Sequence, residues 1–140
     1  MILFCDTSAL LKLYVVESES ALIREQAALA QAVAVCRIAW VEAHSALSRR
    51  GREVPSDLTA METAKLSLAS DWSHYFCIEV TQSLVELAGN YADMFALRAY
   101  DSVQLACASE VARLSEMPVI FASFDLRLNK AAKLLGLRGL

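Results

Sequence analysis

Glycine and proline are scarce in this chain, with 4 glycines and 2 prolines among 140 residues. No glycine follows the first apolar run, residues 2–5, so neither a dinucleotide-binding fingerprint nor a phosphate-binding P-loop is present. No linker, repeat or low-complexity segment divides the sequence, and its length is usual for one domain. We therefore expect a single domain over residues 1–140.

Long hydrophobic runs are also missing. The richest, residues 27–41, is broken by Gln31 and Arg37 and is shorter than the roughly 20 residues of a membrane span. The amino terminus lacks a basic start and Asp6 interrupts its apolar region, so it does not match a signal peptide. The four cysteines have no metal-ligand spacing and are expected to be buried free thiols. These features predict a cytoplasmic protein without a membrane span.

Short apolar runs alternate with amphipathic helical patterns along the chain. The expected strands are residues 2–5, 33–36, 75–80 and 119–122, with an edge strand at 137–140. The expected helices are residues 8–16, 20–31, 38–50, 58–70, 81–94, 100–116 and 126–135, the third ending at Gly51. This alternation predicts an α/β fold in which helices cover both faces of a parallel sheet.

Acidic residues follow or open several of these elements. Asp6 follows the first strand, Asp125 comes shortly after strand 119–122, and Asp101 opens the most apolar helix. The carboxyl ends of parallel strands and the amino ends of the following helices share one edge of a sheet, where ligands bind. We therefore expect these three carboxylates at that edge. Glu42, on helix 38–50, is a fourth candidate.

Each acid also has a simpler structural explanation. Aspartate is a favoured helix N-cap, which suits Asp6 and Asp125. Asp101, with Gln104 three residues later, resembles a capping box. Glu42 can be explained as a solvated helix residue. Taken together, however, clustered carboxylates repel one another unless a cation neutralises them, and Mg²⁺ or Mn²⁺ prefers such oxygen ligands.

A site of this kind can orient a phosphodiester, activate a water and stabilise the leaving oxygen. The hydroxyls of Thr7, Ser8 and Ser123 are expected either to orient the carboxylates or to cap helices. His44 and His74 are isolated, and we interpret them as packed or surface side chains. Neutralising the four acids would change the net charge from −3 to +1, so composition does not exclude a nucleic-acid substrate.

Four stretches in this order resemble the PIN domain family, and most closely its single-domain VapC-type toxins from prokaryotic toxin–antitoxin pairs. They are F-C-D-T-S-A-L-L-K-L-Y at 4–14, I-A-W-V-E-A-H-S-A-L-S-R-R at 38–50, L-R-A-Y-D-S-V-Q-L-A at 97–106 and F-A-S-F-D-L-R-L-N-K-A-A at 121–132. The resemblance implies a three-layer α/β/α domain with a five-stranded parallel sheet. It implies a Mg²⁺- or Mn²⁺-dependent ribonuclease, a small antitoxin partner and a homodimer. The family's metal-binding and catalytic acids would fall on Asp6, Glu42, Asp101 and Asp125.

Two positions depart from the family pattern. Gln104 stands where many relatives carry histidine, so this chain has no titrating side chain there. Trp40 stands where smaller residues are frequent, which would alter the groove or the antitoxin contact. The candidate RNA contacts, which are equally explained as ordinary solvated cations, are Arg49, Arg50, Arg52, Arg98, Arg127 and Lys130.

The sequence also allows two functions other than a ribonuclease. One is a catalytically weak PIN-fold binding module that acts through an antitoxin-like partner. The other is a phosphatase resembling the haloacid dehalogenases, which needs a second aspartate two residues after the first. Ser8 occupies that position here, so the sequence disfavours the phosphatase.

Overall fold

The computed structural model describes all residues, 1–140. Five parallel strands form one sheet in the order β3-β2-β1-β4-β5. Their bounds are Ile2–Cys5 (β1), Ala32–Cys36 (β2), Phe76–Ile78 (β3), Val119–Ala122 (β4) and Arg138–Gly139 (β5). The prediction of an α/β domain around a five-stranded parallel sheet is confirmed.

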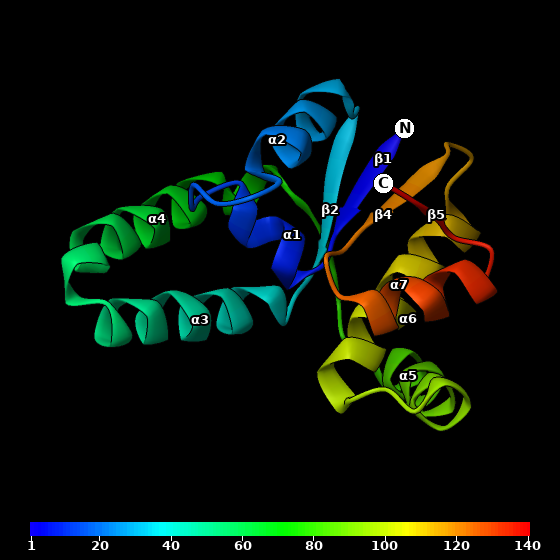
Figure 1. The fold of residues 1–140 in the computed structure, drawn as a ribbon. Coiled ribbons are helices and arrows are strands. Elements are labelled where there is room, and N and C mark those ends of the chain that lie inside the picture. Colours follow the sequence, from blue (N-terminus) through cyan, green and yellow to red (C-terminus); the bar gives the residue numbers. More distant parts are fainter.

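Seven α-helices cover the sheet on both faces (Figure 1). Helices α1 (Thr7–Lys12), α2 (Ser20–Leu29), α3 (Ala39–Glu53) and α4 (Leu58–Asp71) lie on one side. Helices α5 (Gln82–Phe95), α6 (Ala99–Leu114) and α7 (Leu126–Leu134) lie on the other. Two short 3₁₀ helices, η1 (Pro55–Asp57) and η2 (Trp72–His74), flank α4. No helix is both long and apolar enough to cross a membrane.

The central strand β1 is buried on both faces, which explains its continuous apolar sequence. Phe4 stacks on Phe121 of β4, with ring centroids 6.0 Å apart, in the core under α5, α6 and α7. Leu3 and Cys5 point to the opposite core, under α1 to α4. All four cysteines are free, as the sequence predicts, but only three of them are buried, because Cys77 lies on the edge strand β3 and is partly exposed.

The chain changes direction across the sheet at β1. It first adds β2 and β3 on one side of β1, and later adds β4 and β5 on the other. The Asp6 amide donates to the Ala122 carbonyl at 3.0 Å, so the loops after β1 and β4 begin side by side. In open parallel sheets, a crevice for ligands forms where the connections diverge in this way. The fold thus places the residues after β1 and β4 together.

The expected end of the third helix at Gly51 is wrong. Helix α3 continues to Glu53, and Gly51 is buried inside it. A β-carbon at Gly51 would lie 3.1 Å from Leu58 Cδ1, at the turn into α4. The glycine therefore permits close packing of the α3–α4 hairpin and does not end the helix, a distinction that the local sequence pattern does not make.

Other boundaries shift by a few residues. Helix α1 ends at Lys12, four residues before its expected end. Strands β3 and β5 are shorter than expected, and both lie at the edges of the sheet, where each has hydrogen bonds to only one neighbour. Trp40 stacks on His44, with ring centroids 4.6 Å apart, and meets Trp72 edge-on. Its bulk is thus taken up between α3 and η2, and His44 is a packed histidine as predicted.

Candidate functional site

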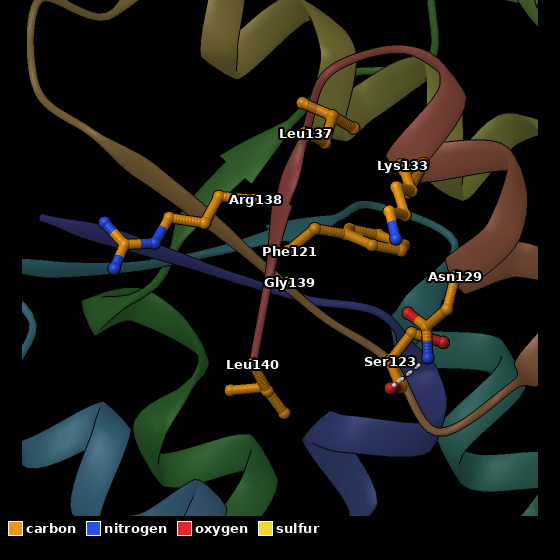
Figure 2. A pocket seen from close by; sticks show the side chains of 9 residues that line it. Phe121, Ser123, Asn129, Lys133, Leu137, Arg138, Gly139 and Leu140 are labelled. Carbon is orange, nitrogen blue, oxygen red and sulfur yellow. Dashed lines mark hydrogen bonds between the residues drawn. The ribbon is translucent and has the colours of Figure 1, made fainter.

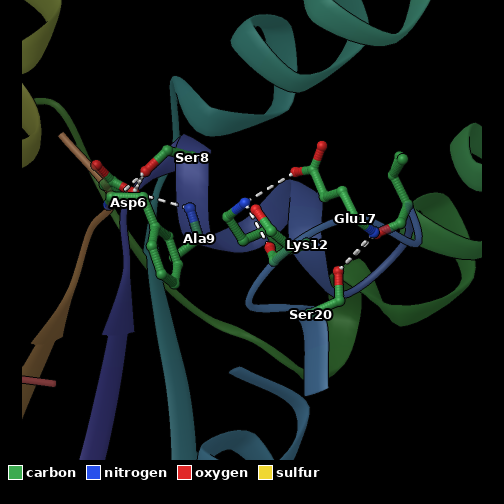
Figure 3. Close-up of polar contacts among 9 residues, drawn as sticks. Asp6, Ser8, Ala9, Lys12, Glu17 and Ser20 are labelled. Atoms are coloured by element: carbon green, nitrogen blue, oxygen red, sulfur yellow. Dashed lines mark hydrogen bonds and ion pairs between the residues drawn. The ribbon is translucent and has the colours of Figure 1, made fainter. Parts of the chain in front are cut away.

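Asp6 is the most enclosed acid at the carboxyl edge of the sheet. It follows β1, is 3% exposed and serves as the N-cap of α1 (Figure 3). Its Oδ1 accepts hydrogen bonds from the Ala9 amide at 2.9 Å and the Ser8 hydroxyl at 2.6 Å. The Ser8 hydroxyl oxygen also accepts from the Phe124 amide at 3.0 Å, which ties α1 to the loop after β4. Capping, one of the two explanations that the sequence left open, is therefore present.

The pKa of Asp6 is raised from 3.8 to about 6. Burial is the largest cause, because it removes water from the charged carboxylate. Hydrogen bonds from Ser123, Ser8 and Ala9 act in the opposite direction and lower this pKa, whereas the charge of Asp101 raises it. The negative charges of Asp6 and Asp101 are thus close enough to repel each other. The buried carboxylate of Asp6, with a second negative charge at Asp101, is the electrostatic feature that distinguishes the edge.

Glu42 is held in a network that joins three helices. Its Oε1 accepts from the Thr7 hydroxyl of α1 at 2.9 Å and from Gln104 Nε2 of α6 at 2.8 Å. Gln104 Nε2 also donates to Thr7 Oγ1 at 3.0 Å. The interpretation of Glu42 as a free solvated residue is wrong, because two side chains bind its carboxylate and it is only partly exposed. Thr7 links this network to its neighbour Asp6.

Asp101 lies in the first turn of α6 with 26% of its side chain exposed. Its Oδ2 accepts from Arg98 Nε at 3.3 Å, a weak contact at the protein surface. The N-cap of α6 is Arg98, which makes no side-chain capping bond, and Gln104 binds α1 and α3. The capping box expected for Asp101 and Gln104 is therefore wrong.

Asp125 is the N-cap of α7, and its Oδ1 accepts from the amides of Arg127 and Leu128 at 2.9 and 3.1 Å. Its own amide donates to the Ser123 hydroxyl at 3.1 Å. Ser123 is 5% exposed and also bonds the Asp6 carboxylate. Capping explains one oxygen of Asp125, and Ser123 is the side chain that joins this acid to Asp6.

The fold brings the four acids to one edge but does not gather them into a closed cluster. No three histidine, cysteine, aspartate or glutamate side chains lie close enough together to hold a metal ion as they stand. Asp6 and Asp101 interact through their charges, whereas hydroxyl and amide groups link Glu42 and Asp125 to Asp6. The assignment of all four as metal ligands therefore stays a prediction.

The donor chemistry of this edge fits a hard divalent cation. Every candidate donor is an oxygen, and the set contains no sulfur or nitrogen ligand. The buried Asp6 is destabilised in its charged form, partly by Asp101. A doubly charged cation would offset that repulsion, so Asp6 and Asp101 could serve as ligands of Mg²⁺ or Mn²⁺.

Two adjoining cavities open beside these acids. One of about 560 Å³ has Thr7, Ser8, Glu42 and Arg49 in its wall, and one of about 380 Å³ has Glu42 and Asp101. Arg98 and Tyr100 line both. Volumes of this size suit a nucleotide-sized ligand.

Tyr100 and Gln104 are two residues of this edge that sequence reasoning did not assign to the site. Tyr100 is 60% exposed and directly precedes Asp101. An exposed aromatic side chain beside a candidate catalytic acid is the signal that could have found it. Gln104 lies three residues after Asp101, yet its contacts with α1 and α3 connect residues 62 and 97 positions apart. No local pattern predicts contacts at that separation.

The structure places only some of the expected RNA-contacting cations beside the acids. Arg49 and Arg98 line the cavities beside the acids. Arg50 forms an ion pair with Asp57, and Arg127 donates to the Ala96 carbonyl at 2.8 Å. Arg52 and Lys130 are exposed and form no ion pair. Arg49 and Arg98 are thus the two members of the expected set that the fold places at the acidic edge.

A separate hollow of about 490 Å³ lies between α7, β4 and β5 (Figure 2). Lys133 and Arg138 line it, and neither forms an ion pair. At one end of the hollow, the side-chain amide of Asn129 donates to the Ser123 carbonyl at 2.9 Å. Ser123 also belongs to the acidic edge, so the hollow and the acidic edge adjoin at this residue. No acidic side chain lines this hollow, and the sequence analysis did not single out its two cations.

The fold agrees with what family comparison finds. The PIN domain profile matches residues 3–134, nearly the whole chain, and the protein belongs to the PIN domain family. Its similar relatives include two proteins of Mycobacterium tuberculosis, Ribonuclease VapC45 and Ribonuclease VapC49. Each is 30% identical to this chain over 141 residues, covering 98% of this chain and 93% of the relative.

Solved structures with the same fold include a toxin–antitoxin complex from Klebsiella pneumoniae, with a TM-score of 0.58 at 20% identity, covering 86% of this chain and 84% of that one. VapBC2 from Rickettsia felis, bound to a DNA fragment from its promoter, gives a TM-score of 0.66 at 13% identity, covering 100% of this chain and 98% of that one. VapBC-1 from nontypeable Haemophilus influenzae gives 0.65 at 10% identity, covering 100% and 97%. At these identities the likeness establishes the fold alone.

Proposed function

We propose that this protein is a divalent-metal-dependent endoribonuclease and the toxin of a toxin–antitoxin pair. Membership of the PIN domain family and the two relatives named ribonucleases support the reaction class. The observation that carries the metal dependence is the Asp6 carboxylate, which is buried at the edge that carries the other candidate acids, and whose pKa is raised mainly by burial and also by the charge of Asp101. A doubly charged ion is the partner that stabilises such a pair.

Asp6 and Asp101 are the principal metal ligands in this proposal, and Glu42 and Asp125 complete the set directly or through water. When bound, Mg²⁺ or Mn²⁺ supplies charge neutralisation at the scissile phosphate and an activated water. The chain's own hydroxyl groups keep the carboxylates in place: Ser8 donates to Asp6 and Thr7 donates to Glu42. No protein nucleophile is required.

Cleavage of RNA in the presence of Mg²⁺ or Mn²⁺ tests this proposal. Purified protein is expected to cut RNA when either ion is present, to stop when EDTA is added, and to recover when excess Mn²⁺ is restored. The substrates are total tRNA, ribosomal RNA and an unstructured messenger RNA, because the proposal does not specify which class of RNA is cut. Failure to cut any of them with either ion would overturn the proposal and favour the binding module.

A small antitoxin is the proposed protein partner, and a homodimer the proposed assembly. Toxin–antitoxin complexes among the solved structures of this fold support the partner. Several apolar side chains of the α1 loop and the α3–α4 hairpin are at least half exposed, namely Val16, Val41, Leu58 and Leu66. An exposed apolar surface of this kind suits a protein contact. The same cleavage assay tests the partner, because an equimolar antitoxin is expected to suppress cleavage.

RNA is proposed to enter over Arg49, Arg98 and Tyr100, which line the cavities beside the acids. Arg49→Ala is expected to weaken RNA binding several-fold, because Arg49 is exposed and without an ion-pair partner. Losing one phosphate contact should also reduce the slope of log K against log salt by about 0.7. Fluorescence anisotropy with a single-stranded RNA in EDTA measures both quantities without cleavage.

The matched control is Arg24→Ala on α2, which also removes an exposed arginine without an ion pair. Helix α2 leads into the amino end of β2, at the opposite edge of the sheet from the acids. An equal loss of affinity in both variants would indicate diffuse electrostatic binding and contradict an RNA path over Arg49.

A further inference from the structure

Gln104 is a polar side chain that is almost completely buried at the acidic edge. It lies on α6 and is 2% exposed. Its amide nitrogen donates both hydrogens, one to Glu42 Oε1 at 2.8 Å and one to Thr7 Oγ1 at 3.0 Å. These two bonds fasten α6 to α3 and α1, which are otherwise separate elements of the acidic edge.

The other end of the same amide is unsatisfied. Gln104 Oε1 is buried and has no hydrogen-bond partner. A buried carbonyl oxygen without a donor is destabilising, and this cost offsets part of what the two donated bonds contribute. The net gain in folding stability from a glutamine at this position is therefore smaller than its two bonds suggest. The helix-capping role suggested by its spacing from Asp101 is also absent.

The orientation of the amide depends on the charge of Glu42. An ionised carboxylate only accepts hydrogen bonds, so the nitrogen end of Gln104 must face it. Turning the amide over would set Gln104 Oε1 against Glu42 Oε1, acceptor against acceptor. The Thr7 hydroxyl donates to the same Oε1 at 2.9 Å, so both bonds hold one oxygen of the carboxylate. The second oxygen, Oε2, accepts no hydrogen bond from the protein.

We propose that Gln104 is a positioning residue that fixes the Glu42 carboxylate with Oε2 free for a divalent cation or its water. This inference rests on the proposed function, because it assigns Glu42 to the metal-binding set. Glu42 lines both cavities beside the acids. Thr7, which donates to Glu42, directly follows Asp6 in the chain. The amide thus gives the Glu42 carboxylate a defined orientation at this edge.

Gln104→Met separates positioning from structural support, since methionine has a similar length and no donor. In EDTA the variant is expected to stay folded and to unfold at a modestly lower temperature than the wild type, because it removes the unpaired carbonyl but also loses the two bonds that Gln104 donates to Glu42 and Thr7. Its affinity for Mn²⁺, measured by calorimetry, should fall about 10- to 100-fold, the usual loss when a group that orients a ligand is removed. In the cleavage assay kcat should fall while KM for RNA stays near the wild-type value.

Two further variants make the measurement specific. Gln82→Met, at an exposed position at the start of α5, is the matched control and should bind Mn²⁺ as the wild type does. Gln104→His keeps a ring N–H donor and should recover part of the Mn²⁺ affinity that Gln104→Met loses. Recovery by a donor identifies the hydrogen bond, and not the packing volume, as the important feature.

The outcomes separate this inference from the function on which it rests. If the wild type binds no Mn²⁺, the proposed metal dependence fails and the role of Gln104 fails with it. If the wild type binds Mn²⁺ and folded Gln104→Met binds it equally well, the positioning role alone is overturned. An Mn²⁺ affinity that is as low in Gln104→His as in Gln104→Met, although the histidine keeps a ring N–H donor, would show that the hydrogen bond is not the important feature, and would also overturn it.

Discussion

Asp101→Asn is expected to lower the rate of RNA cleavage by more than about 100-fold while leaving the protein folded. Loss of a group that merely orients a metal ligand already costs about 10- to 100-fold, so loss of a ligand itself should cost more. The substitution keeps the size of the side chain, and asparagine can still accept the weak bond that Arg98 donates. Single-turnover cleavage of a labelled RNA in Mn²⁺ measures the rate, and circular dichroism checks the fold.

The matched control is Asp93→Asn, which changes the same residue type on the exposed surface of α5. It should cleave RNA at the wild-type rate. Full activity of Asp101→Asn would remove Asp101 from the catalytic set. Equal loss in both variants would point to a general effect of surface charge on RNA binding.

Asp6→Asn is expected to stabilise the metal-free protein at neutral pH, although it should abolish metal binding. Because the pKa of Asp6 is raised from 3.8 to about 6, the folded protein binds this proton more tightly than the unfolded chain. The resulting cost to folding is absent below pH 3.8, grows between pH 3.8 and about 6, and is complete above that range. A pKa difference of about 2 corresponds to about 3 kcal/mol, which is the upper limit of the gain.

Urea unfolding in EDTA at pH 7.5 and pH 4 measures this effect. The free energy of unfolding of Asp6→Asn should exceed that of the wild type at pH 7.5, and the difference should nearly vanish at pH 4. Asparagine keeps an oxygen that can accept from Ala9 and Ser8, so the cap of α1 is retained. With Mn²⁺ the wild type alone should gain stability, because a ligand that binds only the folded state stabilises it.

A variant that is less stable than the wild type at pH 7.5 in EDTA would contradict this account. So would a stability difference that stays constant between the two pH values, since the argument depends on ionisation of Asp6. Asp93→Asn again serves as the control, because its carboxylate lies on the exposed surface. Asp6→Asn and Asp101→Asn together test whether the acids at this edge bind a cation at the expense of folding stability.

The buried strands were the elements most closely predicted from the sequence. Strands β1 and β4 match their expected bounds, because four consecutive buried apolar residues suit a strand covered on both faces. The edge strands β3 and β5 were overestimated, since pairing with a neighbour decides their length and the apolar pattern does not. Gly51 was misinterpreted for a related reason. Its role depends on Leu58, which lies next to Gly51 only after α4 folds back against α3.

The candidate site was likewise predicted only in part from the sequence. The position of Asp6 and Asp125 after parallel strands was sufficient to place both at one edge of the sheet. Their local sequence also predicted capping, which both acids perform. The contacts of Glu42 with Thr7 and Gln104 could not be predicted, because the three residues come from three helices that meet only in the folded protein.

The sequence by itself determined the parallel α/β architecture and the shared edge of the acids, because hydrophobic periodicity and chain order are properties of consecutive residues. Only the tertiary structure decided which oxygen atoms are bonded, how deeply Asp6 is buried and that Asp101 lies close enough to raise its pKa. Hydrogen bonds and desolvation depend on distances of a few ångströms between remote segments. Such distances follow from how the helices pack on the sheet, and no local pattern contains them.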